Sequence, residues 1–253
     1  MFRHLVRFVL PAVLISSVAQ GATDTPATST PDGTAPPPGS TTSSRYGKTA
    51  DAHISISRLK EPPKARHLFE KAMRAWMKSA PADAERKLDQ ALKIDPAFPE
   101  ALTLYGAIQC SLQQWESAEQ KIQEAIRIDP TYSPAYVILA GVYNAQDRFE
   151  EAHVAAQKAL SGGANNWDVQ YEIARALIGK REYARALVTT EVALREKHHG
   201  SLLHLAKAHA LLGLRRYSQA LIELRTYLRF QPSGDGSEQA RALLGQVQSL
   251  ASP

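Results

Sequence analysis

The chain has 253 residues, of which 44% are hydrophobic and 22% are charged, and its formal net charge is +5. This length holds one or two domains, and this charge is only mildly basic. The single cysteine, Cys110, excludes an internal disulfide bond, and we expect it to pack as a small, half-buried hydrophobic residue.

The N-terminus has the layout of a secretory signal peptide over residues 1–21. Arg3 and Arg7 give a positive start, residues 8–18 are apolar, and small residues follow. This apolar stretch is too short to span a bilayer, which needs about 20 residues. The leader therefore predicts a periplasmic or secreted protein, with cleavage after Ala19, Gly21 or Ala22. The alternative is an uncleaved leader that anchors the protein in the inner membrane.

Two further segments precede the main body of the chain. Residues 22–52 consist largely of Thr, Ser, Pro and Gly, and such a composition cannot bury enough apolar surface to offset the entropy of ordering. We therefore expect a disordered tether. In residues 53–64, Ile54 and Ile56 alternate with polar residues, which predicts a short extended cap on the first folded unit. The alternative for this segment is the end of a linker.

From residue 65 onward, similar residue types recur every 34 positions without an insertion or deletion. Alanine recurs at Ala84, Ala118, Ala152, Ala186 and Ala220, and again at Ala91, Ala125, Ala159 and Ala193. Small residues recur at Ala72, Gly106, Ala140, Ala174 and Ala208. Proline and then aromatic residues recur at Pro81, Trp115, Phe149, Tyr183 and Tyr217. The five units that this period defines span residues 65–98, 99–132, 133–166, 167–200 and 201–232.

The recurring residues predict a pair of helices in each unit. Apolar residues within the units recur at steps of three and four, which is the helical period. The small residue falls in the first helix and the two alanines in the second, so the helices can approach to about 8–10 Å. The aromatic residue opens the second helix and can fill the gap between neighbouring pairs. A proline near the end of a unit, as at Pro130, stops the helix.

This pattern resembles the tetratricopeptide repeat family over residues 65–232. Residues 99–132 carry it best, through Leu102, Tyr105, Gly106, Ala118, Ala125 and Pro130. Departures from the family pattern occur at Lys71, Ala164, Gln170, His198, His204 and Lys207. The resemblance implies an all-α, right-handed superhelical solenoid of five antiparallel helix pairs. Residues 233–253 then provide a capping helix and tail, because an end of a stack needs a polar outer face.

No constellation of catalytic residues can be assembled from this sequence. It contains no CxxC, HExxH or GxSxG motif and no glycine-rich phosphate loop. His204 and His209 are five residues apart, whereas histidines that share a helical face are three or four apart, and His198 and His199 belong to a turn. We therefore expect no enzymatic activity, no cofactor and no metal.

In the resembled family, the first helix of each unit lines a concave groove that binds a partner protein or peptide. The groove positions are the fifth, ninth and twelfth of each unit. In this sequence the predicted groove residues are Phe69, Met73, Trp76, Thr103, Ala107, Val137, Gly141, Asn144, Tyr171, Arg175, Leu205 and His209. We also place Cys110, Ile178 and Leu212 at such positions.

Charge distribution suggests an alternative function. Residues 65–166 carry 11 basic and 13 acidic side chains, whereas residues 167–232 carry 11 basic and 6 acidic ones. The C-terminal units can thus bind an acidic polymer such as an envelope polysaccharide. The residues concerned are Arg175, Lys180, Arg181, Arg185, Arg215 and Arg216. Export argues against a nucleic acid, a membrane contact is expected only with an uncleaved leader, and the oligomeric state is left open.

Overall fold

The computed structural model describes residues 62–164, 166–196 and 200–251. Within them the chain forms eleven α-helices and no β-strand. The predicted leader and tether, and all but the end of the predicted cap segment, lie outside the described residues. In chain order the helices are α2 (Pro63–Met77), α3 (Pro81–Ile94), α4 (Pro99–Ser111), α5 (Trp115–Ile128), α6 (Ser133–Ala145), α7 (Phe149–Ser161), α8 (Trp167–Gly179), α9 (Tyr183–Ala193), α10 (Leu202–Gly213), α11 (Tyr217–Phe230) and α12 (Asp235–Ala251).

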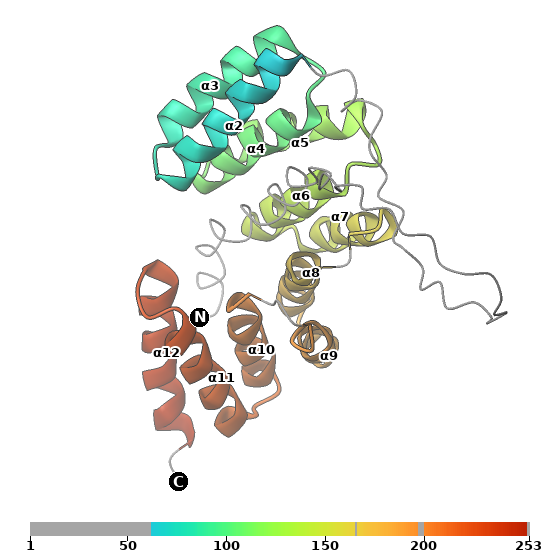
Figure 1. Ribbon diagram of the computed structural model, residues 1–253. Helices are drawn as coiled ribbons and strands as arrows, with labels where there is room; N and C mark the ends of the chain where they lie inside the picture. Colours follow the sequence, from blue (N-terminus) through green and yellow to red (C-terminus); the bar gives the residue numbers. More distant parts are fainter. Residues whose placement is uncertain (1–61, 165, 197–199, 252–253) are drawn as a thin grey trace, which may run out of the picture.

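Consecutive helices pack in pairs, from α2 with α3 to α10 with α11, and the pairs follow one another along an arc (Figure 1). Each first helix also contacts the first helix of the next pair. One pair cannot bury its own apolar face, so stacking of the pairs produces a continuous core. The predicted all-α solenoid of helix pairs is confirmed.

The second helix of every pair begins at the predicted proline or aromatic position, for instance at Pro81 and Trp115. The residue two positions earlier always has a positive φ, between 57° and 63°, as in Gln113. The amide of Gln114 donates to the carbonyl of Gln109, and that of Gln113 to Cys110. These bonds form the turn that closes a helix with one left-handed residue. The turn recurs at Ser79, Asp147, Arg181 and Arg215.

Small residues allow close contacts both within and between pairs. A Cβ atom built on Gly106 of α4 would lie 2.5 Å from Cγ1 of Ile122 on α5. Between pairs, a Cβ atom on Gly179 would lie 2.3 Å from the ring of Phe149, and the same is true of Gly213 and Tyr183. The aromatic residue that opens a second helix therefore packs on the end of the next first helix, as the sequence predicts.

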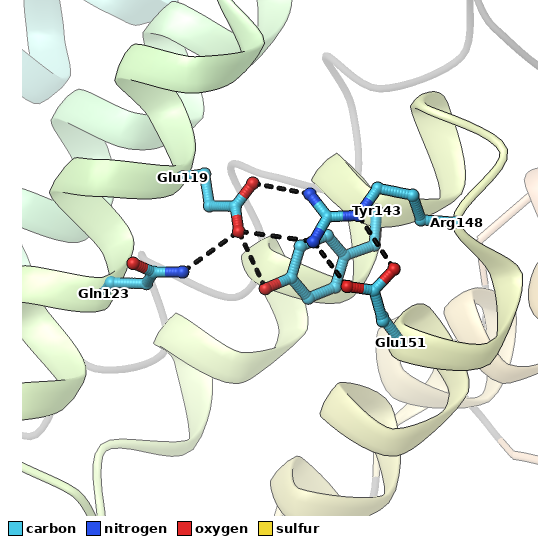
Figure 2. Close-up of polar contacts among 5 residues, drawn as sticks. All are labelled: Glu119, Gln123, Tyr143, Arg148 and Glu151. Carbon is cyan, nitrogen blue, oxygen red and sulfur yellow. Dashed lines mark hydrogen bonds and ion pairs between the residues drawn. The ribbon is translucent and has the colours of Figure 1, made fainter.

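A polar cluster connects the second and third helix pairs (Figure 2). Glu119 on α5 accepts hydrogen bonds from the hydroxyl of Tyr143 at 3.0 Å and from Nη1 of Arg148 at 2.7 Å. The Arg148 guanidinium lies 4.1 Å from the centre of the Tyr143 ring. Gln123 and Glu151 extend the cluster by bonding to Glu119 and Arg148. Such partly exposed pairs stabilise weakly, but together they fix how the two pairs are oriented.

The solenoid ends on α12, which packs against α11. Ala240, Leu243 and Val247 of α12 are buried. Two departures from the family pattern also have a structural reason in this region. Glu223 of α11 pairs with Lys207 at 2.9 Å and with His204 at 2.7 Å, so both polar residues of α10 are satisfied between the helices.

Candidate partner-binding surface

The predicted groove residues lie on the first helices α2, α4, α6, α8 and α10. Figure 1 shows α6, α8 and α10 on the inner side of the arc and α7 and α9 on its outer side. The fifth, ninth and twelfth positions of the successive units therefore fall on one continuous series of neighbouring helices, as the resemblance implies.

Most of the predicted groove residues are buried, whereas residues that line an open groove are expected to be exposed. Among the twelve, Met73, Trp76 and His209 keep a partly exposed surface, whereas the others are buried. Phe69 has no exposed surface and packs against Phe98, with 5.2 Å between the ring centres. The reason is that an inner helix is flanked on both sides by other first helices, whose side chains cover it. The partly exposed residues are accessible from solvent, whereas the buried ones become accessible only through local rearrangement.

A buried polar network occupies the middle of this surface. Arg175 Nη1 on α8 donates to both carboxylate oxygens of Glu172, at 3.2 and 2.9 Å. Nδ2 of Asn144 on α6 donates to Oε2 of Glu172 at 2.8 Å and to its backbone carbonyl at 3.0 Å. The Arg175 guanidinium also lies 5.6 Å from the centre of the Tyr171 ring. The side chains of Arg175 and Glu172 are only 5% and 1% exposed, so this is a buried ion pair.

Glu172 is the member of this network that sequence reasoning missed. It occupies the sixth position of its unit, which is outside the predicted groove positions. The available signal was its spacing from Arg175, because an acidic and a basic residue three apart share one helical face. The ion pair also corrects the polymer-binding alternative. Arg175 is buried against Glu172, and Lys180 pairs with Glu150 at 2.7 Å, so neither cation belongs to a free positive surface.

The titratable groups here are held in their uncharged forms, apart from the ion pair. Burial raises the pKa of Cys110 to about 12, which the nearby charge of Arg175 only partly offsets. The thiol therefore stays protonated and is a poor nucleophile. Burial also raises the pKa of Tyr171 and lowers the pKa of His209 to about 4. Burial alone would lower the pKa of Arg175, but Glu172 and Tyr171 raise it overall.

Four predicted groove residues contain a buried polar atom that has no hydrogen-bond partner in the described part of the chain. These atoms are Nε1 of Trp76, Oγ1 of Thr103, Oδ1 of Asn144 and Nε2 of His209. They belong to four different first helices, α2, α4, α6 and α10. Since buried polar groups are nearly always paired in folded proteins, a series of unpaired ones calls for an explanation. A polypeptide backbone carries both donors and acceptors of the kind that these atoms lack.

The structure offers little for metal or membrane binding. No group of three or more histidine, cysteine, aspartate or glutamate side chains is arranged to hold a metal among the described residues. His204 is engaged by Glu223, and His198 and His199 lie outside the described residues. In the same described part of the chain, every helix is too short or too polar to cross a membrane.

Comparisons with known proteins agree with this architecture. Residues 75–141 match the sequence profile of the tetratricopeptide repeat family. A thermophilic tetratricopeptide repeat protein of Thermus thermophilus is 18% identical, with a TM-score of 0.62 over 73% of this chain and 98% of that one. The APC/C hetero-tetramer Cut9–Hcn1 contains a chain that is 14% identical, with a TM-score of 0.67 over 74% of this chain and 37% of that one.

PilW, a widely conserved type IV pilus biogenesis factor, is 15% identical, with a TM-score of 0.63 over 74% of this chain and 89% of its own. At these identities the structural matches show the fold alone. No curated protein sequence matches the chain. The 34-residue register and the paired helices extend the likeness to the tetratricopeptide repeat family from residues 75–141 over the rest of the solenoid.

Proposed function

We propose that this protein is a non-enzymatic interaction scaffold whose concave surface binds a partner protein or peptide. The observation that carries the proposal is the series of four unpaired polar atoms on α2, α4, α6 and α10. Each lies at a position that the family uses for partner contact. The neighbouring half-buried Met73 and Ile178 add apolar surface at the same face.

Binding would work through a surface that is arranged before the partner arrives. The ion pair of Arg175 and Glu172, held by Asn144, fixes the relation between α6 and α8. Local rearrangement of the side chains then lets the unpaired atoms gain hydrogen bonds from an extended segment of the partner, while the helices themselves stay ordered. No covalent step is involved.

We further propose the domain organisation and location given by the sequence. Residues 1–21 are a cleaved signal peptide, 22–52 a tether, 53–64 a cap segment, 65–232 the solenoid and 233–253 the terminal helix and tail. The protein is then periplasmic or secreted, and an uncleaved leader would instead anchor it in the inner membrane. Mass spectrometry of the N-terminus of protein isolated from cells tests this. A chain that begins within residues 20–23 supports export, and one that begins at Met1 in the cytoplasm contradicts it.

The groove is tested with a variant that removes unpaired polar atoms without removing side-chain volume. It combines Thr103→Val and His209→Leu. Because these atoms have no hydrogen-bond partners in the described chain, the fold should be as stable as that of the wild type or more stable. In cross-linked pull-downs from the cell envelope, the wild type should capture a protein that the variant does not capture. If both proteins capture the same partners, the concave surface is not the binding surface. Gln120→Asp, an exposed change on α5, serves as the control.

A further inference from the structure

A second surface lies on the outer side of the arc, where a hollow of about 500 Å³ opens between α7 and α9. Leu160, Ile173 and Leu177 line its interior and are largely buried. Val188 and Arg185 of α9 also line it but are strongly exposed, so they form its rim. A hollow with an apolar interior and a few polar groups at its edge is the usual form of a binding pocket.

Val188 on the rim is one of three exposed apolar residues that occupy the same repeat position, and we call these three residues the apolar stripe. Val154, Val188 and Ile222 occupy the same position of the third, fourth and fifth units, on α7, α9 and α11. They are 47%, 61% and 61% exposed. The first two units carry Arg86 and Gln120 at this position. At this repeat position, apolar residues therefore occur only in the three units that also form or border the hollow.

The surroundings of the stripe are positively charged. Among the described residues between 181 and 229, seven arginines are exposed, whereas Glu191 is the single strongly exposed carboxylate. Two other acidic residues are paired: Glu182 with Lys180 and Arg185, and Glu223 with His204 and Lys207. Arg185 and Arg225 each lie three positions from a stripe residue on the same helix, so part of this charge stands beside Val188 and Ile222 and complements a partner of negative charge.

The wall of the hollow contains an unused hydrogen-bond donor. His153 is 9% exposed, and its Nε2 lies 3.1 Å from Nε2 of Gln157, which donates to it. Burial, and then the charges of Lys180 and Arg185, lower the pKa of His153, so the ring is neutral. A neutral ring that accepts at Nε2 carries its proton on Nδ1. Nδ1 is buried and has no hydrogen-bond partner within the described chain, so a carboxylate can accept this proton only if the side chains around it rearrange.

We propose that this outer docking surface, made of the hollow, Val188 and Ile222, binds an acidic amphipathic segment of a partner protein. An apolar side chain of that segment enters the hollow, and carboxylates beside it meet His153 and the exposed guanidinium of Arg185, which also pairs with Glu182. An acidic polymer without apolar groups would leave the hollow and the stripe unfilled, so a polypeptide fits the surface better. This surface is separate from the concave one, and the inference does not depend on the proposed function.

The test is a selection of random 12-residue peptides, displayed on phage, against the full chain. Two substitutions probe the surface, and each has a matched control. Val188→Asp is compared with Gln120→Asp, the same position in the second unit. Arg185→Glu is compared with Arg86→Glu, since both arginines are exposed and bond to an acidic residue three positions earlier. All four changes lie on exposed side chains, and thermal melting confirms that each variant is folded.

We expect enriched peptides with an apolar residue flanked by acidic ones. Their affinity should fall about tenfold or more with Val188→Asp and with Arg185→Glu, and stay unchanged with both controls. It should also be unchanged in the groove variant, which separates this inference from the concave site. Peptides that keep their affinity for Val188→Asp, or that lose it equally with Arg86→Glu, would overturn the proposal. The second outcome would indicate general attraction to an acidic polymer instead.

Discussion

The buried ion pair on α8 makes the strongest quantitative prediction. In Arg175→Met the side chain keeps much of its volume but loses its charge, so the carboxylate of Glu172 remains buried at 1% exposure without its cation. Breaking a buried pair in this way costs about 3–5 kcal/mol. The double variant Arg175→Met with Glu172→Gln has no buried charge, and its amide still accepts the hydrogen bond from Asn144. We expect it to recover most of the lost stability.

The assay is urea unfolding at neutral pH, followed by circular dichroism, for the wild type, both single variants and the double variant. The four free energies of unfolding give the coupling between the two residues. A loss below about 1 kcal/mol in Arg175→Met would refute the reasoning, because the pair would then not be a desolvated one. A double variant no more stable than Arg175→Met would also refute the reasoning, because the unpaired charge of Glu172 would then not be the cause of the lost stability.

Three further predictions concern the repeat architecture and the groove, and thermal or urea unfolding checks each. Gly179→Ala places a Cβ atom 2.3 Å from the ring of Phe149 and should cost about 1–3 kcal/mol; an unchanged stability would contradict this contact. Gln113→Gly should stabilise by up to about 1 kcal/mol, because φ is 61° there. The pKa of His209 is lowered to about 4, so stability should decline as pH falls from about 6.5 towards 4, and His209→Leu should flatten that decline.

The helix pairs could be predicted because their determinants recur in the sequence. Gly106 and Ala118 must be small for the helices of a pair to meet, and Trp115 begins the second helix. The left-handed turn residues also recur every 34 positions, but Ser79, Gln113 and Arg181 share no side-chain type. Their conformation is imposed by the turn between two packed helices, so the residue types at these positions do not predict it.

The candidate site could be predicted only in part. Sequence register placed residues such as Asn144 and His209 on the correct helices, because register alone decides the helical face. Burial could not be predicted in the same way, since it depends on how closely successive first helices pack. Thr103 is fully buried although its register position is that of a groove residue. Glu172 was missed because its role depends on Asn144, which lies 28 residues away in another unit.

Partner contact at the concave surface is the central claim, and photo-cross-linking tests it most directly. A photoreactive phenylalanine analogue would replace Met73 or Ile178, which are partly exposed on α2 and α8, or Gln120 on the outer face of α5 as the control. We predict that one protein is cross-linked in cells from both inner positions and not from Gln120. We also predict that Thr103→Val weakens this cross-link while the fold stays intact. Cross-links from Gln120 alone, or an inner cross-link insensitive to Thr103→Val, would contradict the account.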